Sequence, residues 1–213
     1  MTNEALQTIL KKHKMWLNNE AGGEHADLQD YADLQDADLR YADLRNANLL
    51  YTDLQSAYLQ GADLRYADLR YADLRYANLQ GANLQYANLQ YANLRNADLQ
   101  DAKNIPEHVE KQLNNLPKGK LIGYKKCRND VIVTLEIPAK AKRSKSTKNK
   151  CRAEYAKVVA ISDGATEATS TYVDDFKYVV GKTVKPDSWD NNWNNECSNG
   201  IHFFLTMEEA QSY

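Results

Sequence analysis

The sequence predicts a coil built from short repeats, followed by a small α+β domain, and three observations support this. A five-residue unit, made of Ala, Asp or Asn, Leu and two freer positions, recurs fifteen times over residues 26–101. The Ala and Leu stand two and then three residues apart, which fits neither an amphipathic helix nor a half-buried strand. After residue 104 the repeat stops, and strand and helix patterns begin. Because a repeat array buries its apolar side chains against its own neighbours, we expect the pentads to stack as a solenoid.

Each pentad predicts one side of that coil. Leu fills all fifteen third positions, and Ala fills every first position except Thr52. Two inward side chains followed by a polar corner make a side one pentad long. One additional residue between Leu28 and Ala32 breaks the register once, and we expect it to bulge outward at a corner.

The pentads resemble those of pentapeptide-repeat proteins. The pattern is clear in Ala32-Asp33-Leu34-Gln35-Asp36, in Ala67-Asp68-Leu69-Arg70-Tyr71 and in Ala87-Asn88-Leu89-Gln90-Tyr91. The resemblance implies a β-solenoid, a right-handed quadrilateral β-helix with about twenty residues per coil and with Leu and the small residue inside. Fifteen pentads then give a little under four coils.

Four parts follow along the chain: an N-terminal capping helix at 1–25, the pentapeptide-repeat β-helix at 26–104, a capping helix and linker at 105–118, and the α+β domain at 119–213. Apolar residues at helical spacing predict the first helix over 3–19, with His13 as a partly covered surface residue. Pro106 begins a second short helix whose apolar face is Val109, Leu113 and Leu116.

The α+β domain has strand patterns at 121–127, 131–137, 156–161, 176–184 and 201–205, and a last helix capped by Thr206 and Glu209. Its tail, residues 197–210, and the segments 137–140 and 150–152 resemble an uncharacterised domain attached to pentapeptide repeats in phage and bacterial proteins. That resemblance implies a phage source and brings no known activity.

Charge and cysteine content restrict the class of protein. Residues 26–103 carry a net charge of −5 and residues 104–213 one of +3, so neither direct nucleic-acid binding nor membrane attraction is expected. Three cysteines cannot all pair, and no apolar run has the length of a signal peptide or a membrane span. We expect a soluble protein in the cytoplasm of a bacterial host cell.

The outward positions of the coil supply the first group of candidate site residues. Stepping twenty residues places tyrosines in one column, further tyrosines on the adjacent side and aspartates in another column. Stacked tyrosines stabilise a ladder, and a surface rich in tyrosine and charge is typical of protein interfaces; both interpretations can hold. The candidates are Tyr31, Tyr51, Tyr71, Tyr91, Tyr66, Tyr86, Asp33, Asp53 and Asp73.

The second domain supplies the other candidates, as contacts to a partner or ligand. Its basic segment is either a solvated, mobile hairpin loop or a contact for phosphate or an acidic partner, and its two tryptophans either pack over a loop or take part in recognition. Cysteines buried for structural reasons are favoured over a zinc site or a nucleophile pair. The candidates are Lys140, Lys142, Arg143, Arg152, Trp189, Trp193 and His202.

No phosphate-binding loop, dinucleotide fingerprint or hydrolase motif is present, so we expect no catalytic residue, metal or cofactor. The favoured function is a non-enzymatic, phage-encoded scaffold that inhibits or sequesters a host protein such as a defence component. One alternative, implied by the family, is a DNA mimic that binds DNA gyrase or topoisomerase IV. Another is binding or turnover of a nucleotide or small ligand by the second domain, around Lys140, Arg143, Arg152 and His202. The oligomeric state stays open.

Overall fold

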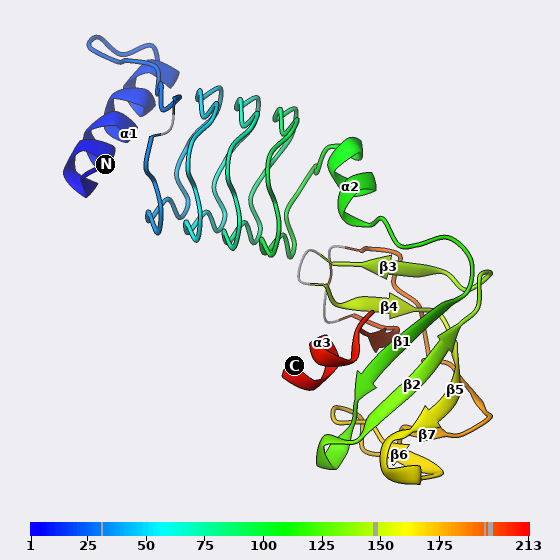
Figure 1. Cartoon of the computed structure of the whole chain (residues 1–213). Helices are drawn as coiled ribbons and strands as arrows, with labels where there is room; N and C mark the ends of the chain where they lie inside the picture. The colour runs from blue at the N-terminus through cyan, green and yellow to red at the C-terminus, as the bar shows by residue number, and fades with distance from the viewer. Residues whose placement is uncertain (31, 147–148, 194, 196–197) are drawn as a thin grey trace. The chain divides into compact units, whose positions relative to one another are not determined.

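The computed structural model describes residues 1–30, 32–146, 149–193, 195 and 198–213. These residues form two compact units, Met1–Leu113 and Asn114–Tyr213. Figure 1 shows the first unit as stacked coils between two helices and the second as an assembly of strands.

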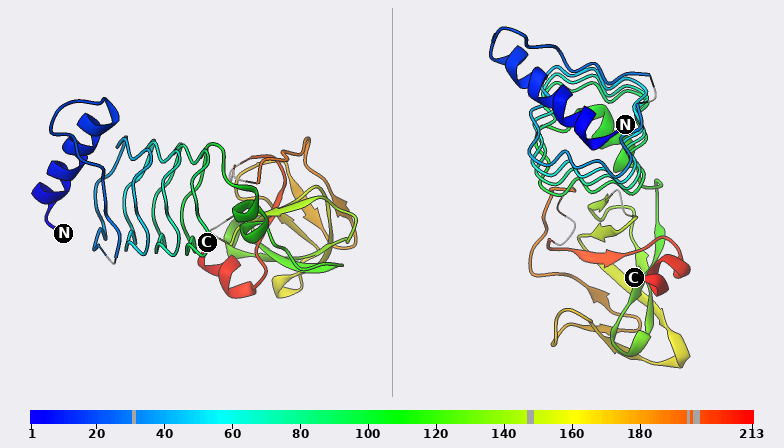
Figure 2. Two further views of the ribbon diagram at one scale, coloured as in Figure 1. Left: turned by 90° about the horizontal axis from the view of Figure 1, so that it is seen from above. Right: turned by 90° about the vertical axis from the view of Figure 1, so that its left-hand side faces the viewer.

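Parallel backbone bridges join each coil of the first unit to the next. They link the second positions of pentads twenty residues apart, as in Asp33 to Asp53 and Asp53 to Asp73. The Leu after each bridge residue donates its N–H to the next coil, for example Leu54 to the Asp73 carbonyl at 2.8 Å. Seen along its axis, the coil has four sides (Figure 2). The twenty-residue spacing therefore corresponds to one pentad per side.

The interior of the coil is filled by the repeated apolar positions. Leu44, Leu54 and Leu69 are completely buried, and the first-position residues Ala47 and Ala62 lie beside them with no exposed surface. Thr52 occupies the one first position without Ala. Its Oγ1 donates to the Leu28 carbonyl at 2.6 Å, so the hydroxyl satisfies a buried acceptor.

The additional residue near the start of the coil changes the bridge spacing once. Asp27 pairs with Asn48, twenty-one residues on, whereas Asp33 pairs with Asp53, twenty residues on. Asp30 takes the left-handed corner of this first side, at φ 61°, and donates its N–H to the Leu50 carbonyl. Tyr31, in the segment where the bulge is expected, lies outside the described residues.

Helix α1 (Asn3–Leu17) lies across the open end of the first coil (Figure 2). His13 on this helix is completely buried, so its prediction as a partly covered surface residue is wrong. Elsewhere in the coil a first-position N–H donates to the Leu carbonyl three residues earlier, and Ala26 has no such Leu. His13 Nδ1 accepts that N–H at 3.0 Å, and its Nε2–H donates to the Arg45 carbonyl at 3.0 Å. One imidazole thus supplies hydrogen-bond partners to two backbone groups at the end of the coil, the Ala26 N–H and the Arg45 carbonyl.

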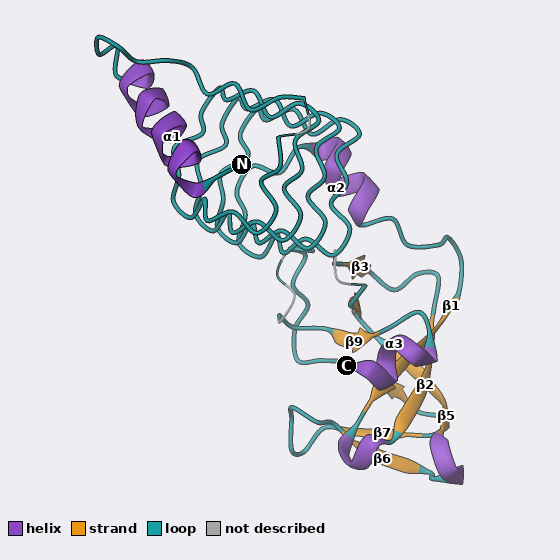
Figure 3. Cartoon of the chain, turned by 60° about the vertical axis from the view of Figure 1, so that its left-hand side comes forward, coloured by secondary structure: helices purple, strands orange, loops and turns teal. Residues whose placement is uncertain are grey.

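Helix α2 (Glu107–Leu113) follows the last coil, at the end opposite α1 (Figure 3). Val109 is its buried residue. The predicted apolar face included Leu116, but the helix ends at Leu113 and Leu116 packs against the core of the second unit.

The second unit contains three antiparallel sheets and a short helix. Their orders are β1-β2-β5-β8, β3-β4-β9 and β6-β7. The elements are β1 (Leu121–Lys126), β2 (Ile132–Ile137), β3 (Arg143–Lys145), β4 (Cys151–Ala153), β5 (Ala156–Ile161), β6 (Glu167–Thr169), β7 (Lys177–Val179), β8 (Thr183–Val184), β9 (Ile201–Phe203) and α3 (Met207–Ser212), with one-turn 3₁₀ segments at Arg128–Asp130 and Ser162–Gly164.

The core of this unit lies between the sheets. Val133, Leu135 and Phe203 are completely buried in it. Gly123 on β1 leaves room for Phe203, because a Cβ there would stand 2.3 Å from its ring. The predicted capping box of α3 is confirmed, with Thr206 Oγ1 accepting from the Glu209 N–H at 3.2 Å.

Two predictions for the second unit need correction. The pattern at 176–184 is not one strand but two, β7 and β8, with Gly181 at φ 81° between them. The basic segment contains strands β3 and β4, which the sequence analysis missed, and Lys150 and Arg152 are buried. Its interpretation as a solvated loop is therefore wrong for these two residues. Residues 147–148 of this segment lie outside the described residues.

Candidate functional sites

The corners of the coil present its most unusual side chains. The fifth residue of each pentad has a positive φ, close to 60°, a conformation that suits Gly and Asn and strains bulky side chains. Gly61 and Gly81 occupy two of these corners, and Asn46 and Asn96 two others. Seven corners nevertheless carry tyrosine, namely Tyr41, Tyr51, Tyr66, Tyr71, Tyr76, Tyr86 and Tyr91.

Five of these tyrosines stack in two ladders. Tyr51, Tyr71 and Tyr91 form the first, with ring centroids 4.8 and 4.9 Å apart and rings within 16° of parallel. Tyr66 and Tyr86 form the second, at 5.0 Å. All five are exposed, from 37% for Tyr51 to 74% for Tyr91. The rings are therefore held by each other while their outer edges face solvent.

The two ladders border a single side of the coil. Each pentad that ends at Tyr51, Tyr71 or Tyr91 begins just after the corner column of Asn46, Tyr66 and Tyr86. We call this side, with its two ladders, the tyrosine-framed face. Between the ladders it carries Asn48, Asp68 and Asn88 at the second positions, and Leu50, Arg70 and Gln90 at the fourth.

Arginines neutralise five of the coil aspartates locally. Arg70 binds Asp68 through two nitrogens, at 2.8 and 2.6 Å, and this hydrogen bonding lowers the pKa of Asp68. The same pairing, two residues apart in sequence, joins Asp38 to Arg40, Asp43 to Arg45, Asp63 to Arg65 and Asp73 to Arg75. On the rungs between the ladders the charges of Asp68 and Arg70 cancel each other, while the first coil adds Asp27 and Asp30 to the same side.

The predicted aspartate column lies on the neighbouring side, beyond the ladder of Tyr51. Asp33 is exposed, Asp53 accepts from Gln35 Nε2 at 2.7 Å, and Asp73 is paired with Arg75. The predicted tyrosine column agrees with the first ladder for Tyr51, Tyr71 and Tyr91. Tyr31 lies outside the described residues, and the equivalent corner of the first coil is Asp30.

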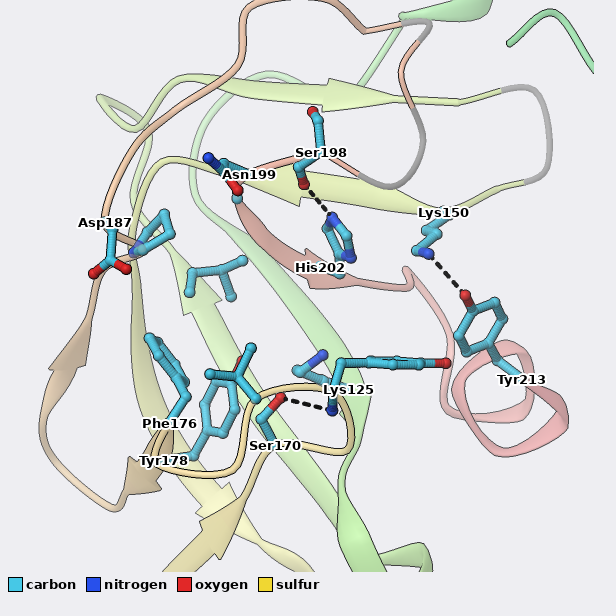
Figure 4. Close-up of a pocket in the computed structure, with 15 residues that line it drawn as sticks. Lys125, Lys150, Ser170, Phe176, Tyr178, Asp187, Ser198, Asn199, His202 and Tyr213 are labelled. Atoms are coloured by element: carbon cyan, nitrogen blue, oxygen red, sulfur yellow. Dashed lines mark hydrogen bonds between the residues drawn. The ribbon is translucent and has the colours of Figure 1, made fainter. Parts of the chain in front are cut away.

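A cavity of about 390 Å³ lies in the second unit (Figure 4). Lys125 on β1 and Lys150 next to β4 are among its lining residues, and both side chains are more than nine-tenths buried. Lys150 Nζ donates to Tyr213 Oη at 2.7 Å and lies 4.7 Å from the centre of that ring. Lys125 Nζ lies 5.9 Å from the ring centre of Tyr178, and burial lowers the pKa of this lysine.

His202 is the one predicted site residue that lines this cavity among the described residues. Its Nε2–H donates to the Ser198 carbonyl at 2.9 Å, and burial, with the nearby Lys150 charge, lowers its pKa to about 4. The imidazole is therefore neutral near pH 7. It supplies shape and a hydrogen-bonding group to the wall of the cavity.

Arg152 and Trp193 are buried, which removes them from any exposed contact surface. Arg152 donates to Ser198 Oγ and to the Asn192 carbonyl, and its guanidinium lies over the Trp189 ring, so it links β4 to these three residues. The prediction that these residues contact a partner is wrong for Arg152 and Trp193, because their side chains pack inside the unit.

The remaining basic candidates lie elsewhere. Lys140 and Lys142 are exposed, and Arg143 Nη1 donates to the Gly119 carbonyl at 2.7 Å. None of the three is among the described residues that line the cavity. Lys125, Lys150 and Tyr213 were not predicted as a group, because they come from distant parts of the chain. The signal it overlooked was Lys125, a charged residue at an inward position of an alternating strand.

Cys127 and Cys151 are buried, and burial raises their thiol pKa to about 11 and about 12. The structural interpretation of these two cysteines is confirmed, since a thiol of such high pKa is unreactive; Cys197 lies outside the described residues. Within the described ranges, no three His, Cys, Asp or Glu side chains are grouped to hold a metal ion. Among the helices described, none is both long and apolar enough to cross a membrane.

Comparison with known proteins gives matches for both regions. Residues 26–65 and 62–101 match the family model of the pentapeptide repeats, and residues 112–210 match a family of unknown function, DUF5758. None of the curated proteins compared matches the chain.

Three solved structures are similar to the repeat region. A pentapeptide repeat protein from Nostoc Pcc 7120 is 37% identical over 44% of this chain and 79% of that one, with a TM-score of 0.30. One from the cyanobacterium Cyanothece 51142 is 34% identical over 33% of this chain and 52% of that one, with a TM-score of 0.24. One from the Arabidopsis thaliana thylakoid lumen is 29% identical over 41% and 74%, with a TM-score of 0.17. Since the pentads match their family model and bridge every twenty residues, the chain is a pentapeptide-repeat β-solenoid followed by a DUF5758 domain.

Proposed function

We propose that this protein is a non-enzymatic scaffold that binds another protein through the tyrosine-framed face. The observation that carries the proposal is the pair of exposed tyrosine ladders bordering one side of the coil. Tyrosine is enriched at the energetic centres of protein interfaces, because it offers a large contact area and a hydroxyl at low entropic cost.

The stacking makes this surface suitable for tight binding. Each ring in a ladder is already oriented by its neighbour 4.8 to 5.0 Å away, so little side-chain freedom is lost when a partner docks. Between the two ladders the face has no net charge, since Arg70 neutralises Asp68; the carboxylates of Asp27 and Asp30 lie beyond the ladders, on the first coil. A suitable partner therefore presents a flat, neutral surface with hydrogen-bonding groups, rather than a strongly basic one.

We infer that this partner is a bacterial host protein, such as a defence component, which a phage-encoded scaffold would inhibit or sequester. The resemblance of the C-terminal segments to domains of phage proteins supports this choice. The alternative of a DNA mimic acting on gyrase or topoisomerase IV has less support, because five coil aspartates are each neutralised by an adjacent arginine. A supercoiling assay separates the two, since a mimic would inhibit gyrase and a scaffold of neutral surface would not.

The direct test is capture of a partner from bacterial lysate by three proteins: the purified chain, a triple variant of the first ladder, and a double variant that serves as the control. In the first, Tyr51, Tyr71 and Tyr91 become Asn, a residue that the coil already accepts at corners. In the control, Tyr41 and Tyr76 on the other two corner columns become Asn. We expect one stoichiometric partner, lost with the ladder variant and kept with the control. Failure to recover a partner, or equal capture by both variants, would contradict the proposal.

A further inference from the structure

The cavity of the second unit has cations at one end. Lys125 and Lys150 both line it, Lys150 beside Tyr213 and Lys125 beside Tyr178 (Figure 4). The two lysines are 8% and 7% exposed. They are close enough for the Lys150 charge to oppose protonation of Lys125. Two ammonium groups therefore line one cavity while largely shielded from bulk water.

No carboxylate of the described residues forms an ion pair with either lysine. Lys150 has the Tyr213 hydroxyl and ring as its partners, and Lys125 has the Tyr178 ring. Burying a cation without a counter-charge is unfavourable, and buried lysines are normally paired. An anion in the cavity would compensate both charges at once.

The rest of the cavity differs from its cationic end. Asp187 and Asn199 lie on the opposite side from Lys150 and Tyr213 (Figure 4). Phe176, Tyr178 and Ile201 add apolar and aromatic surface to the lining. The lining thus combines buried cations, apolar and aromatic side chains, and a far side with a carboxylate and an amide.

We propose that this cavity binds a small organic anion with a planar ring that carries hydrogen-bond donors, of about the size of a nucleoside monophosphate. The anionic group lies against Lys125 and Lys150, the ring packs on Phe176 and Tyr178, and the donors reach Asp187. A volume of about 390 Å³ is within the range of small-molecule sites. The proposal concerns the DUF5758 domain and does not depend on partner binding by the coil.

Titration calorimetry on the full-length chain tests this with defined probes. The four nucleoside 5′-monophosphates and indole-3-acetate carry a ring with a phosphate or a carboxylate, adenosine carries a ring without charge, and inorganic phosphate carries charge without a ring. We expect at least one ringed anion to bind with a dissociation constant below about 1 mM, and at least about tenfold more tightly than adenosine or inorganic phosphate. Binding of a nucleoside monophosphate would identify the anionic group of the ligand as a phosphate, and binding of indole-3-acetate would identify it as a carboxylate.

Lys125→Met and Lys150→Met test the role of the cations, with the exposed Lys140→Met as the matched control. Each pocket variant should weaken binding of the selected anion by at least about tenfold and leave the thermal midpoint equal or higher, since it removes an unpaired buried charge. Lys140→Met should change neither quantity. Binding of none of the ringed anions, binding of adenosine as tight as that of the anions, or undiminished binding by stable Lys125→Met would overturn the proposal.

Discussion

A corner tyrosine combines a backbone cost with a side-chain gain. The left-handed conformation costs roughly 1–2 kcal/mol for a residue with a Cβ, and tyrosine lacks the short polar side chain that makes Asn tolerant of it. Stacked aromatic pairs contribute about 0.5–1.5 kcal/mol each beyond area burial. Tyr71, which stacks on both Tyr51 and Tyr91, recovers this cost, whereas Tyr76 has no ring partner among the described residues.

Replacing each of these tyrosines by Asn should therefore have different effects. Tyr71→Asn loses two stacks and should lower the free energy of unfolding by about 1 kcal/mol, once the relieved strain is subtracted. Tyr76→Asn relieves the same strain without losing a stack and should leave stability equal or slightly higher. Urea unfolding of the two variants measures the difference. Equal losses would mean that the stacks contribute nothing.

At the scale of elements, helix α1 depends on a neutral histidine. His13 Nδ1 accepts the Ala26 N–H, so a proton on Nδ1 would face a donor instead of an acceptor. Burial is the main reason that the pKa of His13 lies below its ordinary 6.5. The imidazole stacks on Trp16 at 5.6 Å, which joins the hydrogen-bonded group to the apolar face of the helix. The helix therefore closes the coil by hydrogen bonding as well as by apolar contact.

Stability should consequently depend on pH through His13. Because the pKa of His13 is lower in the folded state, the unfolded chain takes up the proton first as the pH falls. The free energy of unfolding that His13 contributes is therefore fully present above about pH 6.5 and is lost below it. His202 acts in the same direction in the second unit, between pH 6.5 and about 4. His13→Gln should reduce the fall in thermal midpoint between pH 7 and pH 5, and the exposed His108→Gln should not. An unchanged pH dependence in His13→Gln would refute this role.

At the scale of the whole molecule, two separate cores support the fold. Leu69 lies in the column of buried leucines inside the coil, and Leu135 lies in the sheet core of the second unit. The two residues belong to different compact units, each with its own contacts. Each unit can therefore lose its core packing while the other keeps its own.

Leu69→Ala and Leu135→Ala should act on different parts of the unfolding curve. Each removes a completely buried side chain and should cost about 2–5 kcal/mol in its own unit. Differential scanning calorimetry should show one transition lowered by the first variant and another lowered by the second. If both variants lower a single common transition to the same extent, the two units unfold together.

The sequence predicted the coil far better than the second unit. Each pentad repeats the same local rule, so Leu69 is buried for the same reason as Leu44 or Leu94. In the second unit, β3, β4 and β6 have three residues each, too few for alternation to be visible. The cavity was predicted only through His202, because Lys125, Lys150 and Tyr213 come together through long-range pairing. The burial of His13 was not predicted, because the backbone groups that it hydrogen-bonds belong to the end of the coil and not to its own helix.

The twenty-residue spacing of the bridges also constrains how such a chain can change in length. Duplicating twenty residues would add one rung to every column and lengthen both tyrosine ladders without altering their order. Duplicating five would turn everything downstream by a quarter of the circumference, so that the later tyrosines would continue a different edge. The single additional residue beside Asp30 stands before all five ladder tyrosines, where a local disturbance leaves their alignment intact. The tyrosine-framed face can therefore lengthen only by whole coils of twenty residues.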